Sequence, residues 1–326
     1  MITMSNDFDE YTLLPAYSSV DNRNDISLST RLTKKLKLSI PLVSSPMSTV
    51  TELDMALAMS WHGGAGVIHR YMPIKEQAHQ IHQFRKQSKG IIGAAIGVKD
   101  GMERIKFLES THPPNFYMFD IANGDLKECY DITEEASSKD IEIISGNIVT
   151  HTAAKRYAEA GIAGFRVGVG SGSVCTTRRV TGFGRNQVLA IQYIHDYFPD
   201  IPITSCGGIR YSGDIVKALA FGAESVLIGR LFATCDESSA PRLPDGRITY
   251  GGMASFFSEN MRAERTGEKL SDIHHSIAPE GVHEILESTG PVAKTIERLL
   301  GGIKSGLAYY GGSRHIKEFQ EKIRYE

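Results

Sequence analysis

The chain has 326 residues, with 36 Lys and Arg against 38 Asp and Glu, and 41% of its residues are hydrophobic. This length and apolar content suit one large α/β domain or two small ones. The near-zero net charge argues against nucleic acid as a main partner, and no apolar stretch approaches the roughly 20 residues of a membrane span. Because residues 1–7 lack a secretion-signal pattern, we expect a cytoplasmic protein without a membrane partner.

Short apolar segments alternate with amphipathic helical patterns along the chain. Strands are expected at Ile40–Ser44, Gly66–His69, Ile91–Ile96, Phe116–Asp120, Ile141–Ser145, Gly164–Val169, Pro202–Ser205 and Ser225–Ile228. Helices are expected between them, for example at Leu53–Trp61, Ile74–Lys86, Ala153–Ala160 and Gln187–Tyr197. Strands that are apolar throughout and are each followed by a helix indicate a parallel sheet buried on both faces, and eight such units favour a (β/α)8 TIM barrel. The alternative is a doubly wound sheet, although no glycine fingerprint follows the first strand.

After the eighth unit the pattern breaks. Residues 235–285 are rich in Gly, Ser, Pro and charge, and we expect a long mobile flap loop there because loops of this length are usually functional. A C-terminal helical tail is expected at Val292–Leu299 and Ile316–Ile323. The whole chain, 1–326, then forms a single barrel domain with no inserted regulatory domain.

Polar and glycine residues follow most of the expected strands, and in a barrel these strand ends gather at one mouth, where active sites lie. They are residues 44–47, 69–70, 120–124, 146–147, 168–177, 206–208 and 229–230.

A glycine-rich loop, Gly168-Val-Gly-Ser-Gly-Ser-Val-Cys175, follows one of these strands. Its glycines let backbone groups face a ligand, and Ser173 can donate to a phosphate. The four cysteines match no zinc or disulfide spacing, so we expect free thiols, and Cys175 is placed for nucleophilic attack. The other reading of the loop is a tight turn that happens to hold a cysteine.

Two further glycine turns, Cys206-Gly207-Gly208 and Gly229-Arg230, end the last two expected strands. Turns after the seventh and eighth strands commonly bind phosphate in this fold, and Arg230 adds charge. This pattern predicts a phosphorylated ligand and says little more about it.

These motifs resemble those of IMP dehydrogenases and GMP reductases. The stretch 170–184 is similar to their nucleophile loop, and further matches run along nearly the whole chain, at residues 14–16, 44–51, 207–214, 250–253, 300–306 and 310–312. The resemblance implies a homotetramer, a purine nucleotide substrate, and a K⁺ ion held mainly by the backbone carbonyls of Gly170, Gly172, Cys175 and Arg178.

The resemblance also implies a reaction in which the Cys175 thiolate attacks C2 of the purine and hydride passes between C2 and a nicotinamide. Three features favour the GMP reductase reaction, with NADPH, over the IMP dehydrogenase alternative, which converts IMP to XMP with NAD. No inserted domain follows the second unit, residues 120–124 and 145–150 resemble the reductase pattern, and residues 258–269 lack the Arg-Tyr pair that activates water in the dehydrogenase. Against this, the length from Met253 to Glu280 resembles a dehydrogenase flap.

The resemblance assigns roles residue by residue. Catalytic roles fall to Cys175, Thr177 and Glu280, the last two as proton-transfer groups. Substrate binding falls to Ser45, Met47, Ser173, Cys206, Gly207, Gly208, Gly229, Arg230, Tyr250, Gly252, Met253 and Ala254. Cofactor binding falls to Arg70, Asp120, Ile121, Ala122, Asn123, Val169, Gly170, Ser305 and Gly306.

One departure concerns the sugar of the substrate. The family usually has Asp-Gly-Gly, with the aspartate accepting bonds from the ribose hydroxyls, where this chain has Cys206-Gly207-Gly208. A thiol is a poor acceptor, so each lost bond weakens a ribonucleotide by roughly 1.5–3 kcal/mol. The substrate is then GMP, dGMP or a modified purine nucleotide. The alternative is that a neighbouring residue binds the ribose hydroxyls in place of the aspartate.

Two other classes of protein stay open. One is an inactive nucleotide-binding paralogue, against which the intact loop from Cys175 to Thr177 argues. The other is a flavin-dependent oxidase on the same phosphate-binding barrel, which would purify as a yellow protein.

Overall fold

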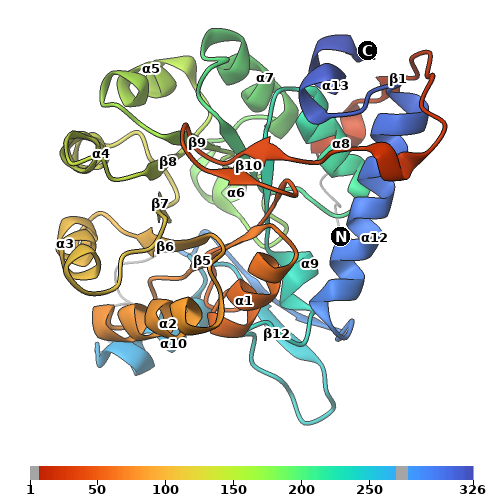
Figure 1. Cartoon of the computed structure of the whole chain (residues 1–326). Coiled ribbons are helices and arrows are strands. Elements are labelled where there is room, and N and C mark those ends of the chain that lie inside the picture. The colour runs from red at the N-terminus through yellow and green to blue at the C-terminus, as the bar shows by residue number, and fades with distance from the viewer. Residues whose placement is uncertain (1–6, 269–277, 326) are drawn as a thin grey trace.

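The structure, a computed structural model, describes residues 7–268 and 278–325. Its centre is a closed barrel of eight parallel strands, in the order β10-β11-β4-β5-β6-β7-β8-β9 around the ring (Figure 1). The strands are β4 (Leu42–Ser44), β5 (Ala65–Ile68), β6 (Ile92–Ile96), β7 (Phe116–Phe119), β8 (Ile143–Ile148), β9 (Gly164–Val167), β10 (Ile203–Cys206) and β11 (Ser225–Ile228). The predicted (β/α)8 TIM barrel is confirmed, and the alternative of an open, doubly wound sheet is wrong because β4 pairs with both β5 and β11.

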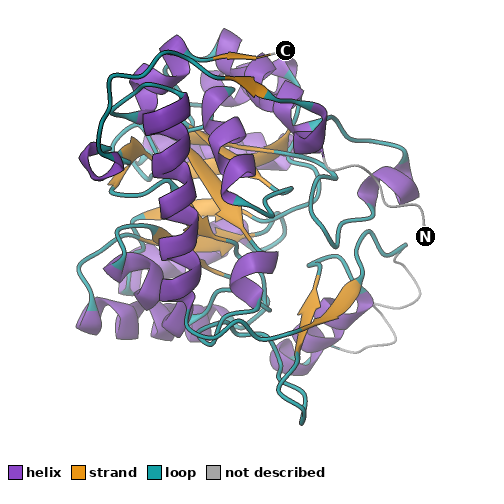
Figure 2. Ribbon diagram, turned by 90° about the vertical axis from the view of Figure 1, so that its right-hand side faces the viewer, coloured by secondary structure: helices purple, strands orange, loops and turns teal. Residues whose placement is uncertain are grey.

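Helices surround the barrel on the outside (Figures 1 and 2). They are α1 (Leu53–Trp61), α2 (Ile74–Gln87), α3 (Gly101–Thr111), α4 (Lys127–Ser138), α5 (His151–Glu159), α6 (Thr177–Thr181), α7 (Gln187–Tyr197), α8 (Ser212–Ala220) and α9 (Arg230–Ala233). Among the described residues, no helix combines the length and the apolar character that crossing a bilayer requires.

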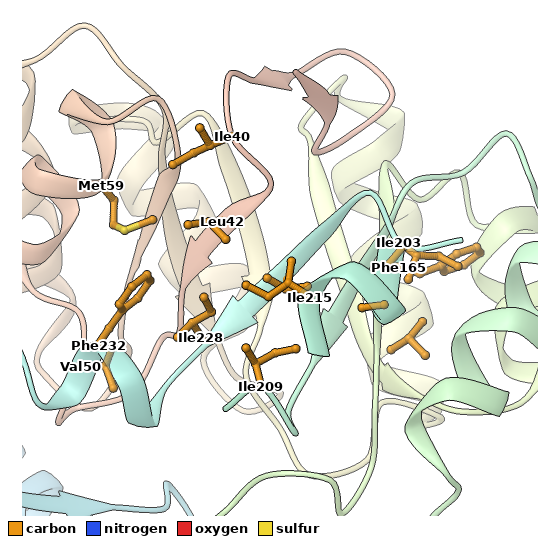
Figure 3. Packing of buried hydrophobic residues seen from close by; sticks show 14 of the residues in the cluster. Ile40, Leu42, Val50, Met59, Phe165, Ile203, Ile209, Ile215, Ile228 and Phe232 are labelled. Carbon is orange, nitrogen blue, oxygen red and sulfur yellow. The ribbon is translucent and has the colours of Figure 1, made fainter. Parts of the chain in front are cut away.

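Side chains alternate between two apolar clusters along the barrel strands. On β7, Phe116 and Met118 belong to the cluster inside the barrel, whereas Tyr117 and Phe119 belong to the larger cluster between strands and helices. This alternation follows from the two-residue period of a strand, and it explains why every residue of β7 is buried. Figure 3 shows part of the larger cluster, in which Phe232 and other side chains fill the space beside the sheet.

A short hairpin closes the amino-terminal end of the barrel. Its strands are β2 (Thr30–Arg31) and β3 (Lys37–Leu38), and Leu32 and Leu38 join the apolar cluster inside the barrel. The amide of Lys34 donates to the carbonyl of Ala163, just before β9 begins. Because this end is filled, the mouth at the carboxyl ends of the strands is the end that can receive a ligand.

The region 235–285 contains more regular structure than the sequence suggested. Within its described part lie α10 (Phe256–Thr266) and the antiparallel pair of β12 (Ile248–Gly251) and β13 (His283–Leu286). Ser255 caps α10 by accepting a hydrogen bond from the amide of Ser258. Part of this region is therefore helix and strand as well as loop. The charged side chains of α10 form ion pairs, Arg265 with Glu52 and Glu76, and Arg262 with Glu259 and Glu268.

The C-terminal tail is also longer than expected. Helix α12 spans Val292–Ser305 and continues into a turn at Gly306–Tyr310, and α13 spans Ile316–Lys322. The sequence predicts that the helix ends at Leu299, before Gly301 and Gly302, but Gly302 lies inside it where α12 contacts α8. A Cβ at Gly302 would lie 2.0 Å from the hydroxyl of Ser212, so the glycine serves close packing of the two helices. Shorter pieces complete the chain at Asp7–Glu10, Arg23–Asp25, β1 (Leu13–Leu14) and β14 (Arg324–Tyr325).

Candidate active site

A cavity of about 240 Å³ opens at the carboxyl ends of the barrel strands. Later stretches of chain around Gly252 and Glu280 complete its wall. The structure brings the following predicted site residues together around this cavity: Ser45, Met47, Arg70, Asp120, Ile121, Ala122, Val169, Gly170, Gly172, Cys175, Thr177, Cys206, Gly207, Gly229, Tyr250, Gly252, Met253, Ala254 and Glu280.

Three side chains on one stretch of the cavity rim form a continuous chain of hydrogen bonds. The thiol of Cys175 donates to Thr177 Oγ1 at 3.2 Å, and the hydroxyl of Thr177 donates to Glu280 Oε2 at 2.7 Å. Thr177 is buried and Cys175 is half-buried, so the thiol can be reached from the cavity while the relay behind it is shielded. A carboxylate at the end of such a chain can take up the thiol proton through the hydroxyl, which leaves a nucleophilic thiolate.

Backbone hydrogen bonds fix the distance between this thiol and this carboxylate. The amide of Thr176 donates to the carbonyl of Glu280 at 2.7 Å, and the amide of Val282 donates to the carbonyl of Val174 at 2.9 Å. The two stretches thus pair as a short antiparallel bridge, although Thr177 and Glu280 are 103 residues apart in the sequence. Glu280 is held in place by the backbone as well as by its own side chain.

Tyr250 and Gly229 meet where β11 opens into the cavity. A Cβ at position 229 would lie 2.6 Å from the Tyr250 hydroxyl oxygen, so only glycine allows this approach. The same hydroxyl donates to Met47 Sδ at 3.5 Å. Burial raises the pKa of Tyr250, which keeps the phenol protonated and able to donate to a ligand at neutral pH.

A second stretch of the rim holds a buried arginine that the sequence analysis did not identify. Arg166 on β9 donates through Nε to Cys206 Sγ at 3.3 Å and through Nη1 to Asp120 Oδ1 at 3.2 Å. The other carboxylate oxygen of Asp120 is buried without a hydrogen-bond partner among the described residues, and so is Oδ1 of Asn147. Both residues line the cavity. Buried acceptors without partners are rare in folded proteins, so these two atoms point to a ligand that brings hydrogen-bond donors.

The matching family model covers residues 5–326 and is described as the IMP dehydrogenase / GMP reductase domain. The chain belongs to this family. It is therefore an oxidoreductase.

Among curated members of the IMP dehydrogenase/GMP reductase family, the chain is 34% identical to an inosine-5′-monophosphate dehydrogenase from Cryptosporidium parvum, over 98% of this chain and 90% of the relative. It is 26% identical to a GMP reductase from Leishmania major, over 98% of this chain and 92% of the relative. A solved GMP reductase from Trypanosoma brucei, in complex with guanosine 5′-monophosphate, superposes with a TM-score of 0.90 at 25% identity. That match covers 100% of this chain and 95% of the other.

Some residues with roles implied by the family resemblance do not line the cavity. They are Ser173, Gly208, Asn123, Arg178, Arg230, Ser305 and Gly306. Ser305 and Gly306 lie at the end of α12, and a Cβ at Gly306 would contact Val216 of α8, so the structure places them against the outer helix layer. Arg178 instead pairs with Asp7 through both carboxylate oxygens, at 2.8 and 2.6 Å.

The structure also adds residues to the cavity wall to which the sequence analysis gave no catalytic or binding role. These are Tyr71, Asn147, Arg166, Gly168, Ser171, Val174, Leu227 and Gly281. Of these, Arg166 carried a signal that could have been used. It interrupts an otherwise apolar strand of the barrel, and a charged residue there needs a partner or a ligand.

Helix α10 anchors the chain that covers this family member's cavity. Arg265 donates to Glu52 Oε1 at 2.7 Å and also pairs with Glu76 of α2, beside which α10 lies in Figure 1. Burial raises the pKa of the Glu52 carboxyl, but hydrogen bonds from His69 and Arg265 outweigh it and hold that pKa at about 2. Nearby, the hydroxyl of Tyr71 donates to Glu259 Oε1 at 2.6 Å. These contacts hold α10, and with it the chain after Gly252, against the β5 side of the barrel.

Proposed function

We propose that the protein is a GMP reductase-type enzyme, which converts a guanine nucleotide to the inosine nucleotide and ammonia with NADPH as reductant. The observation that carries this proposal is the hydrogen-bonded chain from Cys175 through Thr177 to Glu280. The GMP bound in the Trypanosoma brucei neighbour supports a purine nucleotide as the substrate.

The relay accounts for every proton in the deamination. Glu280 takes the thiol proton through Thr177, and the Cys175 thiolate then forms a bond to C2 of the guanine ring. The relay returns this proton to the exocyclic amino group, the C2–N bond breaks, and ammonia leaves a thioimidate on Cys175. After hydride has reached C2, the C2–S bond breaks, the inosine nucleotide leaves, and the thiolate takes a proton from water. The sum is GMP, NADPH and one proton giving IMP, NADP⁺ and ammonia, with the thiol restored.

The second stretch of the rim, with Asp120 and Asn147, fits a nicotinamide cofactor, which when bound supplies the hydride. Its carboxamide and ribose carry N–H and O–H donors, and Asp120 Oδ2 and Asn147 Oδ1 are the buried acceptors that lack donors. Arg70 adds a cation, with its Nε 3.9 Å from the Asp120 carboxylate. We expect these residues, with Ile121 and Ala122, to hold the cofactor beside Cys175.

The dehydrogenase reaction is the second candidate, because most of the curated relatives that resemble this chain carry that name. That reaction needs a base that activates water. The sequence has no tyrosine between Tyr250 and Tyr309, and Arg262 and Arg265 are both paired with glutamates on α10 or on neighbouring helices. Without an Arg-Tyr pair, hydrolysis of the thioimidate should be slow, which favours the reductase.

We further propose that the enzyme accepts a 2′-deoxyribonucleotide at least as well as a ribonucleotide. The last residue of β10 presents a thiol to the cavity, and that thiol already accepts a hydrogen bond from Arg166 at 3.3 Å. Among the described residues that line the cavity, the carboxylates are Asp120, bonded to Arg166, and Glu280, bonded to Thr177. Glu280 is engaged in the relay, and the open Oδ2 of Asp120 is assigned above to the cofactor. Neither then replaces the ribose-binding aspartate typical of the family, so a 2′-hydroxyl gains little here.

A K⁺ ion on the cysteine loop belongs to the same proposal. The loop is folded so that the amide of Cys175 donates to the carbonyl of Gly172, and Gly170, with φ of +79°, packs against Arg178. The four residues whose carbonyls would hold the ion are thus neighbours in space, and the Arg178 charge is balanced by Asp7. A homotetramer, implied by the resemblance, is proposed with it. So are a cytoplasmic location, expected from the sequence, and a flap within 235–285 that moves during turnover.

An absorbance assay at the nicotinamide band tests these proposals when run in both directions. GMP and dGMP would each be paired with NADPH and NADH, and IMP and dIMP with NAD⁺ and NADP⁺. We expect oxidation of NADPH with release of ammonia, a kcat/KM for dGMP at least equal to that for GMP, and activation by K⁺ over Na⁺. Formation of XMP from IMP at a comparable rate would contradict the reductase assignment. A clear preference for GMP would contradict only the deoxynucleotide proposal.

A further inference from the structure

A second cavity, of about 370 Å³, lies beside the mouth of the barrel. Three arginines line it, Arg210 from the turn before α8, Arg230 from α9, and Arg298 from α12. None of the described residues that line it is acidic. Its remaining lining residues are Ile209, Tyr211, Ser212, Leu231 and Leu299. Of these, Ile209 also belongs to the apolar core shown in Figure 3.

This cavity shares the two glycine turns with the mouth of the barrel. Cys206 and Gly207 line the mouth, and the residues that follow, from Ile209 to Ser212, line the second cavity. In the same way Gly229 lines the mouth, and Arg230 and Leu231 line the second cavity. The two turns therefore separate the cavities, and a phosphate bound on them would face the arginines.

The three arginines differ in how far their charges are already balanced. Arg230 pairs with Glu284 at 3.1 Å, and both side chains are exposed to solvent. Arg210 pairs with Asp9 and, through its Nε at 3.6 Å, with Asp214; this Nε is buried and makes no hydrogen bond among the described residues. Arg298 is exposed, and no described carboxylate lies within 4.0 Å of its guanidinium. The cavity thus holds donors for a ligand, and these donors come from three different elements.

We propose that this cavity binds the second and third phosphates of a nucleotide whose base and first phosphate occupy the mouth. The inference rests on the proposed function for the position of the first phosphate, at the turns after β10 and β11. Planar guanidinium groups bind phosphate oxygens in pairs, and three of them around one cavity match the charge of a polyphosphate. Nucleoside di- and triphosphates are then ligands of the enzyme, in addition to the monophosphate.

Isothermal titration of the wild-type enzyme without nicotinamide tests this proposal independently of turnover. The probes are GMP, GDP and GTP, together with their 2′-deoxy forms. We expect GDP and GTP to bind at least as tightly as GMP and to compete with it one for one. In Arg298→Ala, the affinity for GTP relative to GMP should fall about tenfold, because one charge-assisted contact is lost. Lys294→Ala is the matched control, since it removes a positive charge from the same helix outside the cavity, and it should leave that ratio unchanged.

Three results would overturn the proposal. In the first, GDP and GTP bind much more weakly than GMP to the wild-type enzyme. In the second, Arg298→Ala and Lys294→Ala change the ratio equally, which indicates a general effect of surface charge. In the third, GTP binds alongside GMP without competing, which places it in a separate site. Loss of the proposed reductase reaction would show only in the absorbance assay, so the two failures can be told apart.

Discussion

Two stretches of the rim of the barrel mouth differ in whether their polar side-chain atoms already have hydrogen-bond partners. On the stretch with Cys175, Thr177 and Glu280, each side chain is hydrogen-bonded to the next. On the second stretch of the rim, Asp120 Oδ2 and Asn147 Oδ1 are buried and lack partners among the described residues. The first stretch is therefore assembled before a ligand arrives, as a reactive thiol requires, whereas the second is completed by the donors of a ligand.

Helix α10 connects the chain beside the relay with the outer helices. It begins shortly after Gly252, whose amide bonds to the carbonyl of Val282 beside the relay, and it ends near Arg265 on the side of β5 and α2. The difference between the two stretches of the rim can be tested by changing each stretch and then this connection.

Replacing Glu280 with Gln should have the largest effect, because it removes the proton acceptor while keeping the backbone bridge. We expect kcat to fall about 10²- to 10⁴-fold. The double variant with Thr177→Val should be little slower than the slower single variant, since both residues serve one relay. Steady-state kinetics check this, with Glu287→Gln, an exposed carboxylate on the same stretch of chain, as the control. Losses that multiply in the double variant would show that the two side chains act separately.

Replacing Arg265 with Met should destabilise the protein, because the half-buried Glu52 carboxylate loses a charged donor. We expect the free energy of unfolding to fall by about 1–3 kcal/mol, and KM for the nucleotide to rise because α10 is released from α2. Urea denaturation and initial rates measure these changes. The comparison variant is Arg262→Met, which removes contacts within α10 and should cost less than about 1 kcal/mol. Equal losses in both variants would contradict an anchoring role.

Replacing Asp120 with Asn should weaken binding of the cofactor more than binding of the nucleotide. The reason is that Asp120 supplies a carboxylate oxygen that we expect to accept hydrogen bonds from the cofactor. We expect KM for NADPH to rise about tenfold and KM for the nucleotide to change little. The measurement is a pair of saturation curves, each at saturating concentration of the other substrate. A rise confined to the nucleotide KM would assign this stretch of the rim to the sugar instead of the cofactor.

Lowering the pH should produce the smallest and most gradual effect, a loss of folding stability as Glu52 becomes protonated. Its pKa is held at about 2, below its ordinary value of 4.5, so its contribution to stability is complete above pH 4.5 and is lost as the pH falls toward 2. Urea midpoints measured between pH 5 and pH 3 should fall less steeply in Glu52→Gln than in the wild type. Parallel curves for the two proteins would show that Glu52 adds no acid dependence.

Much of the fold follows from local pattern. Helices α1 and α7 and strand β11 begin and end where the sequence predicts, because their apolar periods are uninterrupted. Other bounds were missed where a residue serves a distant partner. The helix predicted to end at Leu299 runs on through Gly302, which makes room for Ser212. Arg265 of α10 lies in a charge-rich region that suggested a loop, but it pairs with Glu52 and Glu76.

The sequence by itself determined the barrel, the glycine loop that carries Cys175 and the two turns suited to phosphate, because each depends on residues close together in the chain. The resemblance to a family added Thr177 and Glu280. Only the tertiary structure decided how these groups are joined. It showed the Thr177–Glu280 bond across 103 residues, the bond from Arg166 to Cys206, and the three arginines around one cavity. Such partners are set by distance in space, which the periodicity of a single segment does not encode.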